Sequence, residues 1–291
     1  GLNPTDWKSR MGSRGPFMYD LIVPHHDGSG VIIEVGPGVE RSRIGERVWL
    51  YAGQWQRPMG TAAEFIAVPG SQAASLSDGL TFDEGACLGV PALTTHRCLF
   101  ADGSISGQTI LVTGGAGAVG HYAIQLAKWA GARVITTVSS TNKSDRAKNA
   151  GADHTINYRS DNVVEAIQDL TYGEGVDRIV EVDFGGNLTV SQQILKIGGV
   201  ISPYASTTDR RPAIEYQAFS QRNISFRFVT VFRVSQEDTA NAVVDINQAI
   251  ADEALWHPIA QRFRLSDIAT AHDTQEANIV MGNIIVEVDK V

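Results

Sequence analysis

Residues 108–138 have the sequence QTILVTGGAGAVGHYAIQLAKWAGARVITTV. The apolar run TILVT at 109–113 predicts a buried strand, and apolar residues recur at helical spacing from Ala118 to Ala130. The run RVITTV at 133–138 then predicts a second strand. The stretch therefore predicts a strand, a glycine-rich turn at 114–120, a helix and a strand, in that order.

The turn contains the spacing Gly115-x-Gly117-x-x-Gly120. Glycine permits a tight turn and lets the backbone approach a pyrophosphate, whose charge then meets the free N–H groups of a helix N-terminus. The strand before the turn and the helix after it favour a dinucleotide site. A glycine-rich turn with a purely structural role is the alternative.

The residues after the second strand indicate which dinucleotide binds. An acidic residue about 20 positions beyond the turn binds the ribose hydroxyls of NAD. Here Ser139 to Lys143 follow the strand, and the first carboxylate is Asp145. Hydroxyls and an ammonium bind a 2′-phosphate that a carboxylate repels, so the sequence predicts NADPH rather than NADH. Tyr158 and Arg159 close this pocket from the side in the same prediction; solvated surface charges at Lys143 and Arg159 are the alternative.

The rest of the chain divides into two patterns. Strands and helices alternate from about Gln108 to Val231, which predicts a doubly wound parallel sheet covered by helices on both faces. The tail beyond about Ser235 predicts a helix and a last strand that return to the first domain. Short β-rich runs bounded by Gly and Pro predict a compact antiparallel barrel or sandwich near the start, at VIIEVG (31–36), ERVWLYAG (46–53) and AAEFIAVP (62–69).

Length, charge and composition limit the function. A chain of 291 residues suggests two domains, and its net charge of −8 gives no electrostatic footprint for nucleic acid. Cys87 and Cys98 are too few for a disulfide framework, and we interpret them as small buried side chains. No apolar stretch reaches the ~18 residues of a membrane helix and no signal pattern opens the chain. We expect a cytoplasmic protein with a small-molecule partner and no membrane.

These residues resemble the medium-chain dehydrogenase/reductase superfamily, and within it the zinc-independent quinone oxidoreductases and zeta-crystallin. The resemblance implies an α/β protein: a Rossmann doubly wound domain over residues 99–253, and a GroES-like β-rich catalytic domain over 1–98 and 254–291 whose N-terminal strands are missing. It covers nearly the whole chain, through GLNPTDWKSRMG (1–12), GSGVIIEVGPGV (28–39), ERVW (46–49), GTAAEF (60–65), GACLGVPALTTHRCL (85–99), GADHTINY (151–158), LKIGGVISPYAS (195–206) and MGNIIVEV (281–288).

Zinc-dependent members of the superfamily hold a catalytic metal with a Cys, a His-Glu pair and a further Cys or His. The corresponding positions here are Asn3, the pair His26-Asp27, and Val90. Two possible ligands do not make a catalytic zinc site, which needs three protein groups and an open position. The resemblance therefore implies no metal, and we expect His25 and His26 to be loop residues.

The resemblance also implies which residues form the site. Asn3 hydrogen-bonds a substrate carbonyl or the nicotinamide, with an Asx-type turn before Pro4 as the alternative. Thr94 packs near the nicotinamide, with a helix-start cap as the alternative. Cofactor contacts fall on Ala116, Gly117, Ala118, Val119, Ser139, Lys143, Tyr158, Asn187, Ala205, Ser206, Thr207, Val229 and Thr230.

The function implied is hydride transfer from NADPH to a quinone or another activated carbonyl-conjugated acceptor, without zinc and with a proton from water. An NADPH-dependent enal, enone or enoyl-thioester double-bond reductase is the first alternative. A non-catalytic NADPH-binding or sensing protein is the second. By analogy with the family we expect a homodimer, formed through an edge of the nucleotide-binding sheet shaped by VISPYAS (200–206) and the mixed segment TTDRRPAIEY (207–216) that follows it.

Overall fold

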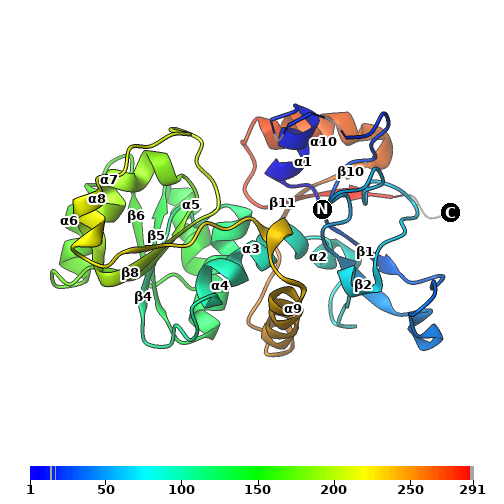
Figure 1. The fold of residues 1–291 in the computed structure, drawn as a ribbon, viewed down its shortest axis with the longest axis horizontal. Helices are drawn as coiled ribbons and strands as arrows, with labels where there is room; N and C mark the ends of the chain where they lie inside the picture. The colour runs from blue at the N-terminus through cyan, green and yellow to red at the C-terminus, as the bar shows by residue number, and fades with distance from the viewer. Residues whose placement is uncertain (14, 17, 289–291) are drawn as a thin grey trace. The chain divides into compact units, whose positions relative to one another are not determined.

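The computed structural model describes residues 1–13, 15–16 and 18–288. Contacts between Cα atoms divide the chain into two compact units. Unit 1 consists of Gly1–Leu93, Val234–Ala251 and His257–Val291, and unit 2 consists of Thr94–Arg233 and Asp252–Trp256. Figure 1 shows the helices and strands of both units.

Unit 2 contains a parallel sheet with the order β6-β5-β4-β7-β8-β9. The order runs outward in both directions from the centre, so the sheet is doubly wound, as the sequence predicted. Its switch point lies between β4 and β7, and ligands bind outside the carboxyl ends of strands at such a point. The strands are β4 (Thr109–Val112), β5 (Arg133–Val138), β6 (His154–Asn157), β7 (Val176–Glu181), β8 (Leu195–Pro203) and β9 (Ser225–Phe226).

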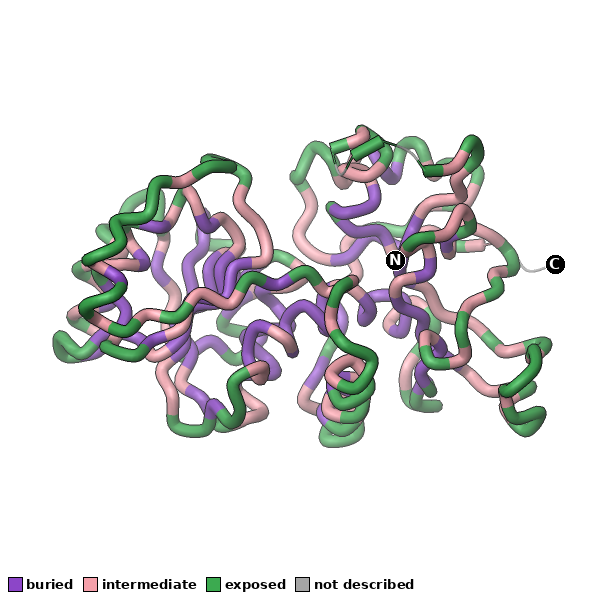
Figure 2. The backbone as a smooth tube through the Cα atoms, viewed as in Figure 1, coloured by how far each residue is buried: buried purple, intermediate pink, exposed green. Residues whose placement is uncertain are grey.

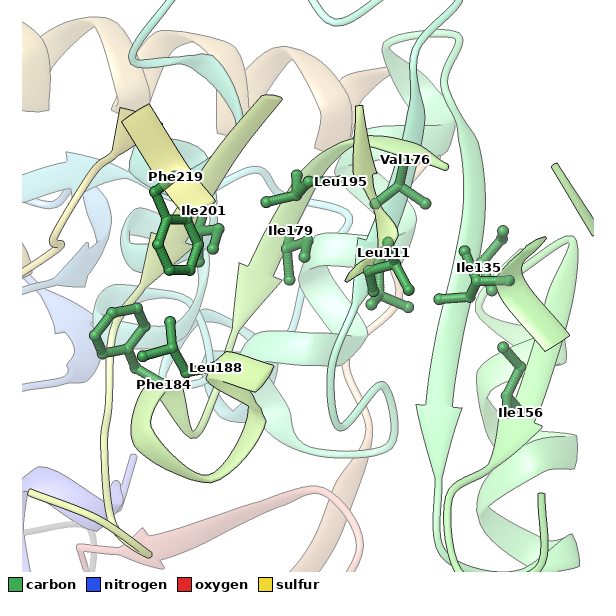
Figure 3. Packing of buried hydrophobic residues seen from close by; sticks show 12 residues of the cluster. Leu111, Ile135, Ile156, Val176, Ile179, Phe184, Leu188, Leu195, Ile201 and Phe219 are labelled. Carbon is green, nitrogen blue, oxygen red and sulfur yellow. The ribbon is translucent and has the colours of Figure 1, made fainter. Parts of the chain in front are cut away.

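Helices cover both faces of this sheet (Figure 1), because helical crossovers join its parallel strands and the strand order runs in opposite directions from β4. Leu111 and Ile179 of the central strands pack with Phe184 and Leu188 in one buried cluster (Figure 3). Figure 2 shows the central strands as the most buried part of unit 2. The helices are α3 (Gly89–Phe100, which begins in unit 1), α4 (Ala118–Trp129), α5 (Thr141–Asn149), α6 (Val163–Leu170), α7 (Phe184–Ile194) and α8 (Tyr216–Ser220), with the short η3 (Val231–Arg233).

Unit 1 contains two small sheets. The strands β1 (Gly28–Val31), β2 (Arg47–Leu50) and β3 (Ala73–Ser75) pair antiparallel, and β10 (Ile259–Arg264) pairs parallel with β11 (Asn283–Glu287). Leu2 forms a β-bridge with Ile284, so the first and last described segments meet in one core. The helices are α1 (Pro4–Arg10), α2 (Phe82–Gly85), α9 (Gln236–Ala251) and α10 (Ile268–Glu276), with the short η1 (Arg41–Arg43), η2 (Gly70–Gln72) and η4 (Leu265–Asp267).

The domain limits differ from the sequence expectation at three places: residues 94–98 and 254–256 belong to unit 2, and residues 234–251 belong to unit 1. We expected residues 99–253 to form one domain, but α9 belongs to unit 1. Its Asn247 accepts a hydrogen bond from the Trp49 indole at 3.2 Å and donates to the carbonyl of Ser75 at 3.3 Å. These contacts, made across long sequence separations, attach the helix to β2 and β3.

Several predicted strand limits are wrong. Residues 62–69 are not a strand, because Thr61 and Ala62 donate their N–H groups to the carbonyls of His25 and Pro24 instead of to a ladder. The run at 31–36 is a strand only as far as Val31. Nor is the segment near 200–206 an edge, because β8 lies between β7 and β9 and the edges are β6 and β9.

Strands and helices alternate up to β9, as the sequence predicted, but the last elements do not have the limits of the runs at 188–196 and 224–231. The helix α7 begins earlier, at Phe184, and β8 begins at Leu195. Only Ser225–Phe226 pair as the strand β9. Across the described part of the chain, no helix combines the length and apolar character needed to span a membrane.

Candidate functional site

The glycine-rich turn connects β4 to α4 at the carboxyl edge of the sheet. Gly114 has a positive φ of 70°, which favours glycine. The N–H of Gly115 donates to the Thr137 carbonyl at 3.1 Å, which ties the turn to β5. Gly117 is the N-cap of α4 and carries no side chain that could cap the helix. The first-turn N–H groups of α4 have no partners within the helix and are therefore suited to bind an anion.

The three glycines of the motif differ in why they must be glycine. A Cβ at Gly115 would lie 2.1 Å from Thr136 Oγ1, and one at Gly120 would lie 2.4 Å from the Gly114 carbonyl oxygen. A Cβ at Gly117 would lie 3.4 Å from that oxygen, an ordinary contact, and its φ of −77° suits any residue. Gly117 is also exposed. Packing within the protein therefore explains Gly115 and Gly120 but leaves Gly117 unexplained.

The predicted phosphate-binding residues gather at the carboxyl ends of β5 and β6. Lys143 Nζ donates to Ser139 Oγ at 3.0 Å, and Ser139 is buried. Ser140 caps α5 through the N–H of Lys143 at 3.4 Å. Tyr158 is half-exposed and its N–H donates to the Val138 carbonyl at 3.1 Å. The Lys143 ammonium therefore lies at the same strand ends as the hydroxyl-bearing side chains of Ser139, Ser140 and Tyr158.

Glu181, at the end of β7, was not predicted and organises the middle of this edge. Its Oε1 accepts hydrogen bonds from Thr113 Oγ1 at 2.9 Å, from the Asp183 N–H at 2.6 Å and from Asn187 Nδ2 at 2.8 Å. Burial raises the pKa of Glu181. An acidic residue that ends a buried apolar strand is the sequence signal that would have found it. Glu181 therefore connects the predicted residue Asn187 to Thr113, the residue between β4 and the glycine-rich turn.

Asp183, which follows β7, holds the loop after β8. Its carboxylate accepts from the N–H groups of Thr207 at 2.7 Å and Thr208 at 3.0 Å. Burial opposes the charged form of Asp183, but hydrogen bonds from Thr208 and from the Thr207 backbone outweigh it and lower the pKa. The Gly185 N–H donates to Ser206 Oγ at 2.9 Å. The predicted residues 205–207 therefore lie beside the start of α7.

The last predicted cofactor contacts follow β9. The Val229 N–H donates to the Pro203 carbonyl at 2.9 Å, and the Val229 side chain is buried. Thr230 is exposed. Both residues follow the strand that pairs with β8, so they lie at the same carboxyl edge as the 205–207 turn.

In unit 1, Asn3 and Asp27 form a buried pair. Asn3 Nδ2 donates to Asp27 Oδ2 at 2.6 Å, and the same oxygen accepts from the Val90 N–H at 2.8 Å. Burial raises the pKa of Asp27 to about 6. Asp6 accepts from the backbone N–H of Asn3 at 2.7 Å, and burial raises its pKa to about 8. Three positions that correspond to metal ligands in zinc-dependent relatives are here joined by hydrogen bonds.

This donor set does not fit zinc. Val90 offers no ligating side chain, and Asn3 turns its amide nitrogen toward Asp27. Burial raises the pKa of the Cys87 and Cys98 thiols to about 12, whereas zinc binds thiolates. Within the described ranges, no group of three or more His, Cys, Asp or Glu residues is arranged to hold a metal ion.

Thr94 and His25 are both buried in the structure. Thr94 is buried inside α3, which begins at Gly89, so the alternative of a helix-start cap is wrong. His25 is a loop residue, as expected, but it is buried, and its Nε2 lies 2.9 Å from His272 Nε2. Burial lowers the pKa of both imidazoles. The pair anchors the loop before Asp27 to α10.

Comparisons with known proteins agree with the fold of both units. Residues 1–78 match the model of the alcohol dehydrogenase GroES-like domain, and residues 118–248 match that of zinc-binding dehydrogenases. The quinone oxidoreductase of Salmonella typhimurium is 28% identical over 264 residues, which cover 88% of this chain and 79% of that protein. A mycobacterial structure described as a complex with NADPH superimposes with a TM-score of 0.86 at 27% identity, covering 99% of this chain and 89% of that one.

A plant relative shares a shorter segment. The 2-methylene-furan-3-one reductase of Solanum lycopersicum is 35% identical over 200 residues, which cover 65% of this chain and 52% of that protein. Together with the doubly wound sheet and its glycine-rich turn, these matches place the chain in the medium-chain dehydrogenase/reductase family of oxidoreductases. Within that family it is a relative of the quinone oxidoreductases.

Proposed function

We propose that this protein is an NADPH-dependent reductase that transfers hydride to a quinone or another activated carbonyl-conjugated acceptor without zinc. Gly117 carries the proposal: neither its conformation nor the space around it requires glycine, and close approach of a pyrophosphate to the backbone supplies the missing reason. The complex with NADPH formed by the mycobacterial relative supports the same cofactor.

The preference for NADPH over NADH rests on the end of β5. A 2′-phosphate placed there meets the Lys143 ammonium and the Ser139 hydroxyl, which lie 3.0 Å apart. Residues 139–144 contain no carboxylate that would repel it. Tyr158 adds a hydroxyl from the neighbouring strand end.

The proposed reaction converts a quinone, one hydride and one proton to a hydroquinone, or reduces an enone across its double bond. The bound nicotinamide supplies the hydride. Unit 2 holds the pyrophosphate on the first turn of α4 and orients the nicotinamide half through the loops that Glu181 and Asp183 fix. Asn3 donates its amide N–H to the acceptor oxygen as that oxygen gains negative charge. Water supplies the proton.

The experiment follows the absorbance of NADPH, with NADH in parallel, against an ortho-quinone, a para-quinone, an enal and a crotonyl thioester. We expect oxidation of NADPH with a quinone. Turnover restricted to the enal or thioester would instead assign a double-bond reductase, the activity in the name of the tomato relative. Tight binding of NADPH without turnover would assign a non-catalytic binding or sensing protein.

A second experiment tests the cofactor site directly. We expect Gly117→Ala to leave the unfolding midpoint unchanged and to weaken NADPH binding by about tenfold or more, because its methyl group meets the ligand and not the protein. An unchanged dissociation constant would contradict the site. The homodimer expected from the family also stays a prediction, which light scattering of the purified protein tests.

A further inference from the structure

Asp27 is placed as a rigid acceptor for the Asn3 side chain. Its backbone carbonyl accepts from Thr61 Oγ1 at 2.6 Å, and its Oδ2 accepts from the Val90 N–H at 2.8 Å. A Cβ at Gly89 would lie 2.0 Å from Asp27 Oδ1, so the first residue of α3 leaves room for this carboxylate. The start of α3 therefore holds the Asp27 side chain, and Thr61 holds its backbone.

The hydrogen bond from Asn3 fixes which end of its amide faces where. A carboxylate accepts hydrogen bonds and does not donate them, so the group next to Asp27 Oδ2, at 2.6 Å, is the amide nitrogen of Asn3. Among the residues that the structure describes, that nitrogen bonds Asp27 alone, which leaves its second N–H as the donor that the proposal requires. A rotation of the amide by 180° would place its carbonyl oxygen against the carboxylate, which is repulsive.

We propose that Asp27 is a positioning residue that keeps the Asn3 amide turned so that it donates to the acceptor oxygen. The inference rests on the proposed function, because the proposed task of Asn3 is to stabilise the charge that grows on that oxygen. An Asn3 amide free to flip presents its own carbonyl oxygen part of the time and repels the acceptor. The capping box of α1 turns the accepting end of the Asn3 side chain toward the Asp6 N–H, and Asp27 holds the opposite, donating end of the amide.

Other charged and titratable groups lie near Asp27. They are Asp6, which accepts from the Asn3 backbone, and the Cys87 thiol. Within the described residues, neither Asp6 nor Cys87 is hydrogen-bonded to the Asn3 amide nitrogen: Asp6 bonds the Asn3 backbone, and the Cys87 thiol bonds the Asp83 carbonyl. Asp6 is therefore a matched control: it is a buried carboxylate on the same segment that holds the backbone of Asn3 and not its side chain.

The kinetic test is a double-mutant cycle on the turnover number for a quinone. We expect Asp27→Ala and Asn3→Ala each to lower kcat by about tenfold to a hundredfold, and the double variant to be no slower than Asn3→Ala alone. Asp27→Asn, whose amide oxygen can accept from both donors, should recover most of the loss. Gly89→Ala, which displaces the carboxylate without removing it, should resemble Asp27→Ala.

The control cycle pairs Asp6→Asn with Asn3→Ala, and we expect its effects to multiply. Multiplicative effects in the Asp27 cycle, or an Asp27→Ala enzyme with the wild-type kcat, would overturn the proposal. If Asp27→Ala does not fold by circular dichroism, Gly89→Ala, which displaces the carboxylate, takes its place in the cycle with the same criteria.

A readout that needs no turnover separates this inference from the proposed function. In the nitrogen–proton NMR spectrum, the Asn3 side-chain amide, assigned by its loss in Asn3→Ala, should have one strongly downfield proton that exchanges slowly with water. Asp27→Ala should abolish that shift, and Asp6→Asn should retain it. A wild-type protein that shows the shift but reduces no acceptor would refute the proposed function alone, whereas an amide signal indifferent to Asp27 would refute the positioning role.

Discussion

The glycine-rich turn of unit 2 and the Asn3–Asp27 pair of unit 1 are built on different principles. The turn is made by backbone: its shape depends on residues without side chains, spaced within seven positions of the sequence. The pair is made by side chains that come from residues 24 positions apart and is completed by the Val90 N–H, 63 positions further on. Backbone sites are local in sequence and can be predicted from spacing, whereas side-chain sites exist only once the chain has folded.

The largest expected effect tests the backbone side of this comparison. In Gly120→Ala the new methyl group would meet the Gly114 carbonyl oxygen at 2.4 Å and Gly115 Cα at 2.8 Å. Because these are backbone atoms that cannot move aside, we expect a loss of about 3 kcal/mol in the free energy of unfolding and no measurable binding of NADPH. Urea denaturation and calorimetric titration measure the two effects. Equal stability of Gly120→Ala and Gly117→Ala would show that the turn is not packed as described.

Glu181 combines the two principles, because its side chain supports the start of the backbone turn through Thr113. Glu181→Ala leaves two donors near the sheet edge without their acceptor, the Asn187 amide and the Asp183 N–H, while the Thr113 hydroxyl keeps the Val180 carbonyl at 3.2 Å. We expect a destabilisation of about 3 kcal/mol, measured by urea denaturation, because buried donors without partners cost about 1–3 kcal/mol each and part of the edge can rehydrate. Glu174→Ala is the control, because Glu174 is an exposed carboxylate of the same unit. A loss of stability no larger than that of Glu174→Ala would show that Glu181 does not support the sheet edge.

The buried carboxylates of unit 1, unlike the backbone turn of unit 2, make the stability of the protein depend on pH. Burial raises the pKa of Asp6 from 3.8 to about 8, so the folded state binds a proton that the unfolded state releases. Stability from this group is therefore full below about pH 4 and is lost as the pH rises toward 8. Relative to wild type, we expect Asp6→Asn to gain about 2 kcal/mol in the free energy of unfolding between pH 5 and pH 7. Parallel urea titrations at several pH values measure this gain, and a constant difference would contradict it.

The sequence predicted unit 2 better than unit 1, because the features of unit 2 depend on residues that are close together in the sequence. The parallel sheet, the turn and the Ser139–Lys143 pair follow from periodicity and short spacing. In unit 1, the run at 62–69 has strand composition, yet the backbone N–H groups at its start bond to the loop at 24–25. The attachment of α9 through Asn247 and the burial of His25 against His272 likewise depend on residues far apart in sequence. Asp27 was identified only as a replaced metal ligand, and its contact with Asn3 required the folded chain.

The smallest expected effect concerns a site in unit 2 that is made by side chains and yet could be predicted from the sequence. Its residues, Ser139 and Lys143, lie only four positions apart. Ser139 and Lys143 lie on one loop and helix start, with the ammonium 3.0 Å from the hydroxyl. We expect Lys143→Ala to weaken NADPH binding by about tenfold, close to 1.4 kcal/mol, while the affinity for NADH stays the same. Fluorescence titration with both cofactors measures the ratio, and Lys148→Ala, a change in an exposed lysine of the same helix, is the control. Equal weakening of both cofactors would mean that Lys143 acts on the shared part of the dinucleotide, and the choice of NADPH would then have to come from residues that local spacing does not identify.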